Sequence, residues 1–186
     1  MSDVEDGAGP DSGQGEDLYE LVTELIETLS AKGETIATAE SLTGGLIGAR
    51  FTDVAGSSAV YRGGVVSYAT DLKASLAGVR QQTLAEHGAV SALTAVEMAL
   101  GVARRCDASW GVAVTGVAGP DEQEGHPVGT VFTAVVRRTD DPDFDDGESD
   151  SVVCVRELRL PGDRAEIRAQ TVRAALRQVR QVCSPN

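Results

Sequence analysis

Segments with helical periodicity alternate along this chain with short β-prone segments, and this alternation constrains the fold more than any other feature. The first periodic segment has a capping residue, Asp17, before it and Gly33 after it. By the same criteria we expect further helices over 46–51, 71–76, 83–86, 91–106 and 164–182, and strands over 35–39, 60–68, 110–114, 129–137 and 152–160. The order predicts an α/β fold, a three-layer α/β/α sandwich around a mixed, partly parallel sheet.

Acidic residues are concentrated in two short stretches, 1–17 and 140–150, which contain no Lys or Arg. The formal net charge is -13, but outside these stretches 16 acids face 16 bases. We therefore expect a disordered acidic tail over 1–16 and one folded domain over 17–186, with an acidic loop over 139–151. A body without a basic stripe is not expected to bind nucleic acid.

Cysteines and histidines are few: three Cys, at 106, 154 and 183, and two His, at 87 and 126. Their spacing matches no zinc-site pattern, so neither a metal nor any other cofactor is expected. No apolar run approaches the roughly 18 residues of a membrane span, and the first residues do not resemble a secretion signal. These features favour a cytoplasmic enzyme or binding protein without membrane partners.

Two glycine-rich turns are expected at strand ends, where α/β proteins bind ligands. They are Ser41 to Gly45 and Thr115 to Gly119. The first places the Ser41 hydroxyl before a helix, where free amides favour negative charge. By itself this residue is either an ordinary helix cap or a nucleophile.

A nucleophilic serine needs a base, and lysine is the best candidate in this chain. Only Lys32 and Lys73 are present among 16 basic residues. A desolvated Lys can become neutral near pH 7, whereas Arg cannot. Lys32 precedes the helix end at Gly33, where a cation is favourable, so Lys73 is the candidate base. Tyr68, five residues earlier, could meet it, although a surface Lys and a packed Tyr remain the alternative.

Several familiar motifs are absent, including the serine β-lactamase pattern and the glycine-rich fingerprints of phosphate and dinucleotide sites. The ordered motifs that are present resemble the CinA C-terminal domain family, the nicotinamide-nucleotide amidohydrolases. They are TAESLTGG at 38–45, AGSS at 55–58, Tyr68 with Lys73, HGAVS at 87–91, TGVAGP at 115–120 and PVGTV at 127–131.

The resemblance spans about residues 17 to 183 and implies a serine amidohydrolase that converts nicotinamide mononucleotide to nicotinate mononucleotide and ammonia, in pyridine-nucleotide salvage. It implies catalytic roles for Ser41, Tyr68 and Lys73, and substrate binding by Thr115 and Arg164. It also implies a homodimer with a small nucleotide as its other partner.

For the reaction itself, we expect Lys73 to remove the Ser41 proton directly or through Tyr68. Backbone amides of Thr43, Gly44 and Gly45 are expected to hold the oxyanion, and the turn containing Gly116 and Gly119 to help bind the ribose phosphate. Two alternatives stay open: a nucleotide-binding or regulatory module without turnover, and an amidase for another small amide.

Overall fold

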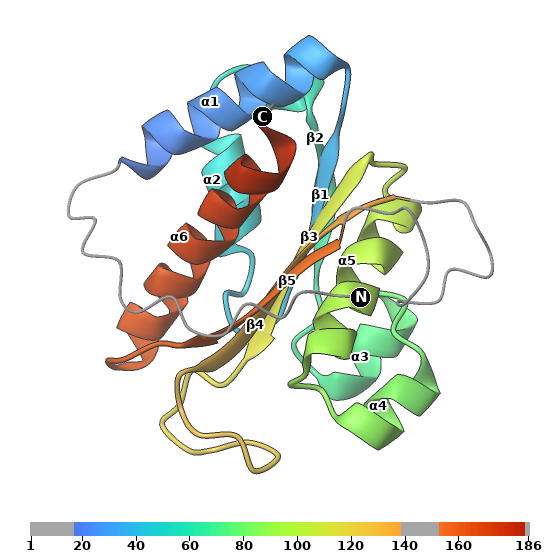
Figure 1. The fold of residues 1–186 in the computed structure, drawn as a ribbon, viewed down its shortest axis with the longest axis vertical. Helices are drawn as coiled ribbons and strands as arrows, with labels where there is room; N and C mark the ends of the chain where they lie inside the picture. The colour runs from blue at the N-terminus through green and yellow to red at the C-terminus, as the bar shows by residue number, and fades with distance from the viewer. Residues whose placement is uncertain (1–16, 139–152, 185–186) are drawn as a thin grey trace.

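The computed structural model describes residues 17–138 and 153–184, so the expected tail over 1–16 and acidic loop over 139–151 lie outside the described residues (Figure 1). Its helices are α1 (Leu18–Lys32), α2 (Leu46–Thr52), α3 (Thr70–Ser75), α4 (Gln81–His87), α5 (Ala92–Arg105) and α6 (Arg164–Cys183), with a short 3-10 helix, η1 (Ser57–Ala59). Its strands are β1 (Ile36–Glu40), β2 (Tyr61–Val66), β3 (Trp110–Gly116), β4 (Thr130–Arg137) and β5 (Val153–Arg159). The predicted elements are all present, with ends shifted by a few residues, and η1 was not predicted.

The five strands form one sheet in the order β2-β1-β3-β4-β5. β1 runs parallel to β2 and β3, whereas β3–β4 and β4–β5 are antiparallel. Helices α1, α2 and α6 cover one face and α3, α4 and α5 the other (Figure 1). The predicted three-layer sandwich with a mixed sheet is therefore confirmed.

Each face of the sheet has its own apolar core because side chains alternate along a strand. Ile36, Val112 and Val114 pack toward α1, α2 and α6, whereas Ala37 and Ala113 pack toward α5. The second face carries small residues because α5 lies very close to it. A Cβ at Gly111 would lie 1.8 Å from the carbonyl oxygen of Ala99 in α5.

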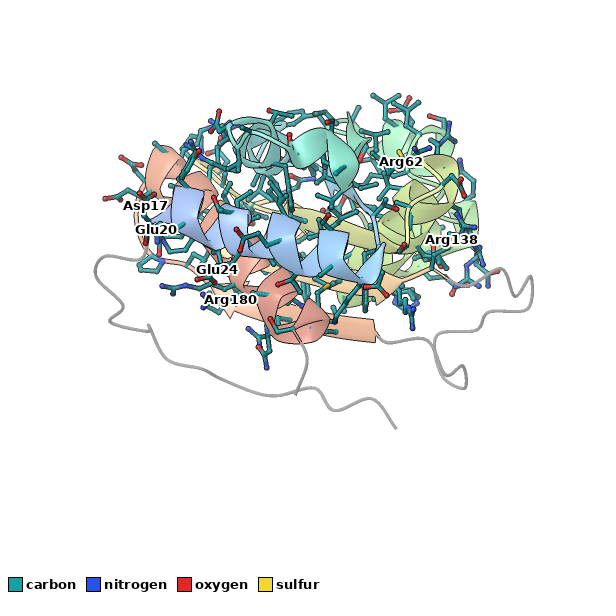
Figure 2. All side chains as sticks on the ribbon, turned by 90° about the horizontal axis from the view of Figure 1, so that it is seen from above. Asp17, Glu20, Glu24, Arg62, Arg138 and Arg180 are labelled. Carbon is teal, nitrogen blue, oxygen red and sulfur yellow. The ribbon has the colours of Figure 1, made fainter. Side chains whose placement is uncertain are left out.

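The helix ends follow the expected capping chemistry. Asp17 accepts the amide of Tyr19 at the start of α1, and Gly33 ends that helix with φ 65°. Asp163 and Glu166 form a capping box at the start of α6. Seen from above, α1 crosses α6, and Glu24 of α1 lies beside Arg180 of α6, 3.6 Å away (Figure 2). This exposed pair adds little stability, so the apolar contacts hold the two helices together.

The strand ends position the residues of interest. β1 ends at Glu40, directly before Ser41, and β2 ends shortly before Tyr68. β3 extends further than predicted, since Thr115 and Gly116 pair with Phe132 and Val131 of β4. The expected turn over Thr115 to Gly119 is thus partly strand, because the antiparallel partner supplies ladder hydrogen bonds that local sequence does not show.

No helix in the described part of the chain is long and apolar enough to span a membrane.

Candidate active site

Ser41 and Lys73, 32 residues apart in sequence, are in direct contact. The Lys73 ammonium donates hydrogen bonds to Ser41 Oγ, 3.0 Å away, and to the carbonyl oxygen of Ser67, 2.9 Å away. Lys73 is only 2% exposed and lies on the short helix α3, whereas Ser41 follows β1. The strand order, with β1 next to β2, brings the two segments together.

Burial changes the acidity of this lysine. It lowers the pKa of the Lys73 ammonium from the ordinary value of 10.5 to about 8, while the negative charge of Glu124 opposes this lowering. A lysine with such a pKa is partly neutral near physiological pH and can then accept a proton from the hydroxyl that it contacts. The geometry and the electrostatics therefore suit a serine nucleophile with a lysine base.

The turn after Ser41 is organised by Glu40, whose buried carboxylate accepts four hydrogen bonds. The donors are Thr43 Oγ1 at 2.7 Å, Gly45 N at 3.0 Å, Ile47 N at 3.0 Å and Gly48 N at 2.8 Å. A carboxylate at the N-terminus of α2 satisfies amides that would otherwise be free and is favoured by the helix dipole. The N-terminus of α2 is therefore already occupied by the carboxylate of Glu40.

Hydrogen bonds within the turn occupy two of the three amides that were expected to hold the oxyanion. The Gly45 amide donates to Glu40, and the Gly44 amide donates to the Ser41 carbonyl oxygen at 3.0 Å. Thr43 has no exposed surface. The residue of this turn that follows Ser41 and borders the pocket is Leu42.

Tyr68 and Arg164 meet at the mouth of the site. Tyr68 is 59% exposed, and its hydroxyl accepts a hydrogen bond from Arg164 at 2.9 Å. Arg164 also donates to the carbonyl oxygen of Gly119 at 2.7 Å. Lys73 contacts Ser41 directly, whereas the recorded partner of the Tyr68 hydroxyl is Arg164.

Thr115 lies deeper, with its side chain buried. Its hydroxyl donates to the carbonyl oxygen of Ala89 at 2.6 Å, so it fastens the end of β3 to the turn that precedes α5. Both Thr115 and Gly116 border the pocket that contains Ser41.

These residues enclose a pocket of about 270 Å³. Its walls include the segment Gly116 to Gln123 and the residues Ala89 and Val90, and the exposed side chains of Tyr68 and Arg164 stand at its mouth. A larger cavity of about 630 Å³ lies between α1, α2 and α6, but it contains neither Ser41 nor Lys73. The smaller pocket is therefore the candidate active site. Within residues 17–138 and 153–184, no cluster of His, Cys, Asp or Glu could hold a metal ion.

The sequence analysis missed Arg168 of α6, which binds the turn after Ser41. Its guanidinium donates to the carbonyl oxygens of Leu42 and Thr43, each at 3.0 Å. Arg164 and Arg168 are four residues apart and so share one face of α6. That spacing is visible in the sequence, but it does not reveal which loops the two side chains contact.

Comparison with known proteins shows the family of the chain. The family model of the CinA C-terminal domain matches residues 18–183. A CinA-like protein of Frankia casuarinae is 47% identical over 176 residues, which are 95% of this chain but only 37% of that protein. The nicotinamide-nucleotide amidohydrolase PncC of Escherichia coli is 40% identical over 161 residues, 86% of this chain and 91% of the relative.

Among solved structures, the competence/damage inducible protein CihA of Agrobacterium tumefaciens superposes with a TM-score of 0.81 at 39% identity, over 91% of this chain and 98% of that one. The family match covers nearly every described residue, and the Escherichia coli relative is matched over most of its own length. The chain therefore belongs to the CinA C-terminal domain family.

Proposed function

We propose that this chain hydrolyses the carboxamide of nicotinamide mononucleotide, releasing nicotinate mononucleotide and ammonia, as a step of pyridine-nucleotide salvage. The observation that carries the proposal is the buried contact between Lys73 Nζ and Ser41 Oγ inside a pocket. The name of the Escherichia coli relative supports the substrate.

The reaction begins with proton transfer from Ser41 Oγ to neutral Lys73. The oxygen attacks the carboxamide carbon, and the negative charge that develops on the carbonyl oxygen is held by the Leu42 amide. The C–N bond then breaks, and Lys73 returns the proton to the departing ammonia. Water, deprotonated by Lys73, attacks the carbonyl carbon of the resulting ester. The bond between this carbon and Ser41 Oγ breaks, Lys73 returns the proton to Oγ, and the nicotinate product leaves.

The phosphate of the substrate would be bound at the mouth of the pocket. Arg164 is the cation there, and its contacts with Tyr68 and Gly119 orient the guanidinium. A guanidinium can bind two phosphate oxygens at once, which favours a nucleotide over free nicotinamide.

The decisive experiment measures ammonia release from nicotinamide mononucleotide, nicotinamide and glutamine, with Ser41→Ala as the inactive control. We expect turnover of the nucleotide alone, with kcat/KM rising with pH around a midpoint near 8 as Lys73 loses its proton. Binding of the nucleotide without ammonia release would identify a binding or regulatory module. Preferred turnover of glutamine or nicotinamide would identify an amidase for another substrate.

A further inference from the structure

Glu124 occupies a backbone position that suits its residue type poorly. Gln123 and His126 exchange two hydrogen bonds, from N to O at 3.2 and 2.8 Å, which makes Glu124 and Gly125 the centre of a two-residue turn. Both have positive φ, 51° and 77°, as in a type I′ turn, where Asn, Asp and Gly are usual. Left-handed backbone is unfavourable for an ordinary L-residue. The turn alone does not account for a glutamate here.

The contacts of the side chain explain why a glutamate stands here, because its carboxylate reaches the turn before α5. Its carboxylate oxygen Oε2 accepts the amide of Ala89 at 2.7 Å and that of Val90 at 3.4 Å. Gly88 leaves room for this approach, since a Cβ there would lie 2.5 Å from the same oxygen. The contact therefore depends on a glutamate at 124 and on the absence of a side chain at 88.

This contact joins two segments of the pocket wall. Ala89 and Val90 line the pocket, and so does the segment that ends at Gln123, directly before Glu124. Thr115 holds the carbonyl oxygen of Ala89 while Glu124 holds its amide, so the turn is fixed through both backbone groups of this residue.

The charge of Glu124 also acts on the base. It favours the protonated form of Lys73 and so keeps the pKa of that group from falling further. Four other ionisable side chains border the same pocket: Tyr68, Asp121, Glu122 and Arg164. Among the described residues, Glu124 is the one whose charge opposes the effect of burial on Lys73.

We propose that Glu124 is a positioning residue of the deamidation site, which ties the wall segment ending at Gln123 to the turn at 88–90. Only the kinetic consequences of this inference rest on the proposed function. The contact and the charge exist whatever the substrate is.

Two substitutions separate the two roles. Glu124→Gln keeps an oxygen that can accept the Ala89 amide but removes the charge, so the rise of kcat/KM with pH should move to lower pH while its plateau is retained. Glu124→Asn is one methylene too short to reach the turn but tolerates the left-handed backbone. It should lower kcat/KM roughly 10- to 100-fold, because the pocket wall is no longer held in place. Its unfolding temperature should not fall.

A second readout needs no substrate. Because the chain contains two lysines, a protein with isotope-labelled lysine gives two side-chain signals in an NMR spectrum. Titration should give Lys73 a midpoint near pH 8 in the wild type and a lower one in Glu124→Gln, with Lys32 as the reference in the same spectrum. Glu86→Gln, an exposed charge loss on α4, is the matched control and should leave the Lys73 midpoint unchanged.

An unchanged Lys73 midpoint in Glu124→Gln would overturn the electrostatic role, and full kcat/KM in Glu124→Asn would overturn the tie between the walls. If the wild type released no ammonia from the nucleotide, the proposed function would fail, while the titration would still decide the role of the charge.

Discussion

Lys73 is distinguished from the 14 arginines of this chain by its ability to lose a proton when buried, since the guanidinium of Arg stays charged in proteins. Its hydrogen bond to Ser41 and its lowered pKa support the same role. Neither property alone would distinguish a base from a buried structural cation, because burial also lowers the pKa of lysines without a function.

Replacement of Lys73 by Arg tests the role directly. Lys73→Arg should reduce turnover by roughly 100- to 10,000-fold, the usual contribution of a general base, while the protein stays folded. Ser41→Ala should be similarly inactive, and the double variant should lose little more, since residues that act together are not additive. Ammonia release at the wild-type rate by folded Lys73→Arg would remove Lys73 from the mechanism.

The buried lysine should also leave a signature in stability. Between pH 8 and 10.5 the unfolded chain binds a proton at this site that the folded chain has lost, so stability rises with pH in that window. Relative to Lys73→Met, the unfolding free energy of the wild type should rise by on the order of 3 kcal/mol. Urea denaturation of both proteins from pH 7.5 to 10 measures the difference. A constant difference would mean that Lys73 titrates alike in both states.

At the scale of the elements, α6 connects the loops of the site. Arg164, at its first position, binds Tyr68 and Gly119, and Arg168, one turn later, binds the turn after Ser41. The helix can do so because its capping box and buried apolar face hold it firmly against the sheet.

We therefore expect Arg168→Ala to lower kcat roughly 10- to 100-fold with a smaller change in KM, because the turn after Ser41 loses two hydrogen bonds that orient it. Added guanidinium ion should restore part of the activity. The control is Arg50→Ala, because Arg50 is an exposed arginine of α2 that forms an ion pair with Asp53. Equal activation of the control by guanidinium would show that the rescue is unspecific.

The start of α2 depends on Glu40 in the same way. Glu40→Gln keeps the shape of the side chain but replaces one of its two accepting oxygens by an NH2 group. One oxygen then remains for the four donors, and the NH2 group points at a donor where an acceptor is needed. We expect a loss of about 1–3 kcal/mol in the free energy of unfolding, measured by urea denaturation. Glu86→Gln, exposed on α4, should change it by less than about 0.5 kcal/mol. Equal stability of both variants would mean that the Glu40 charge is not needed.

At the scale of the whole molecule, we propose that the chain forms a homodimer. β2 is an edge strand of the described sheet, and Val66 at its end is 46% exposed. Symmetric pairs are the commonest assemblies of soluble chains, and an unpaired strand edge is a surface that association would cover. Light scattering at micromolar concentration should give twice the mass of the 19.3 kDa chain. A fully active monomer would show that one copy completes the site.

The sequence by itself determined the order of the elements and two of the chemical groups. Apolar periodicity and capping residues act within a few positions, so the strands, helices and their layers were predictable from local patterns. Ser41 was recognisable by its turn and Lys73 by the rarity of lysine in this chain. The motifs then indicated the family, which the comparisons confirm.

The tertiary structure alone decided which groups meet. Glu40 takes the Gly45 amide, one of those expected to hold the oxyanion, Arg168 reaches the turn after Ser41 across 125 residues or more, and Glu124 binds amides 34 and 35 residues away. The burial of Lys73, and with it the pKa near 8, depends on α3 lying against the end of β1. Local sequence reports contacts between neighbours along the chain, whereas these contacts arise from strand order and helix packing, which involve all the elements together.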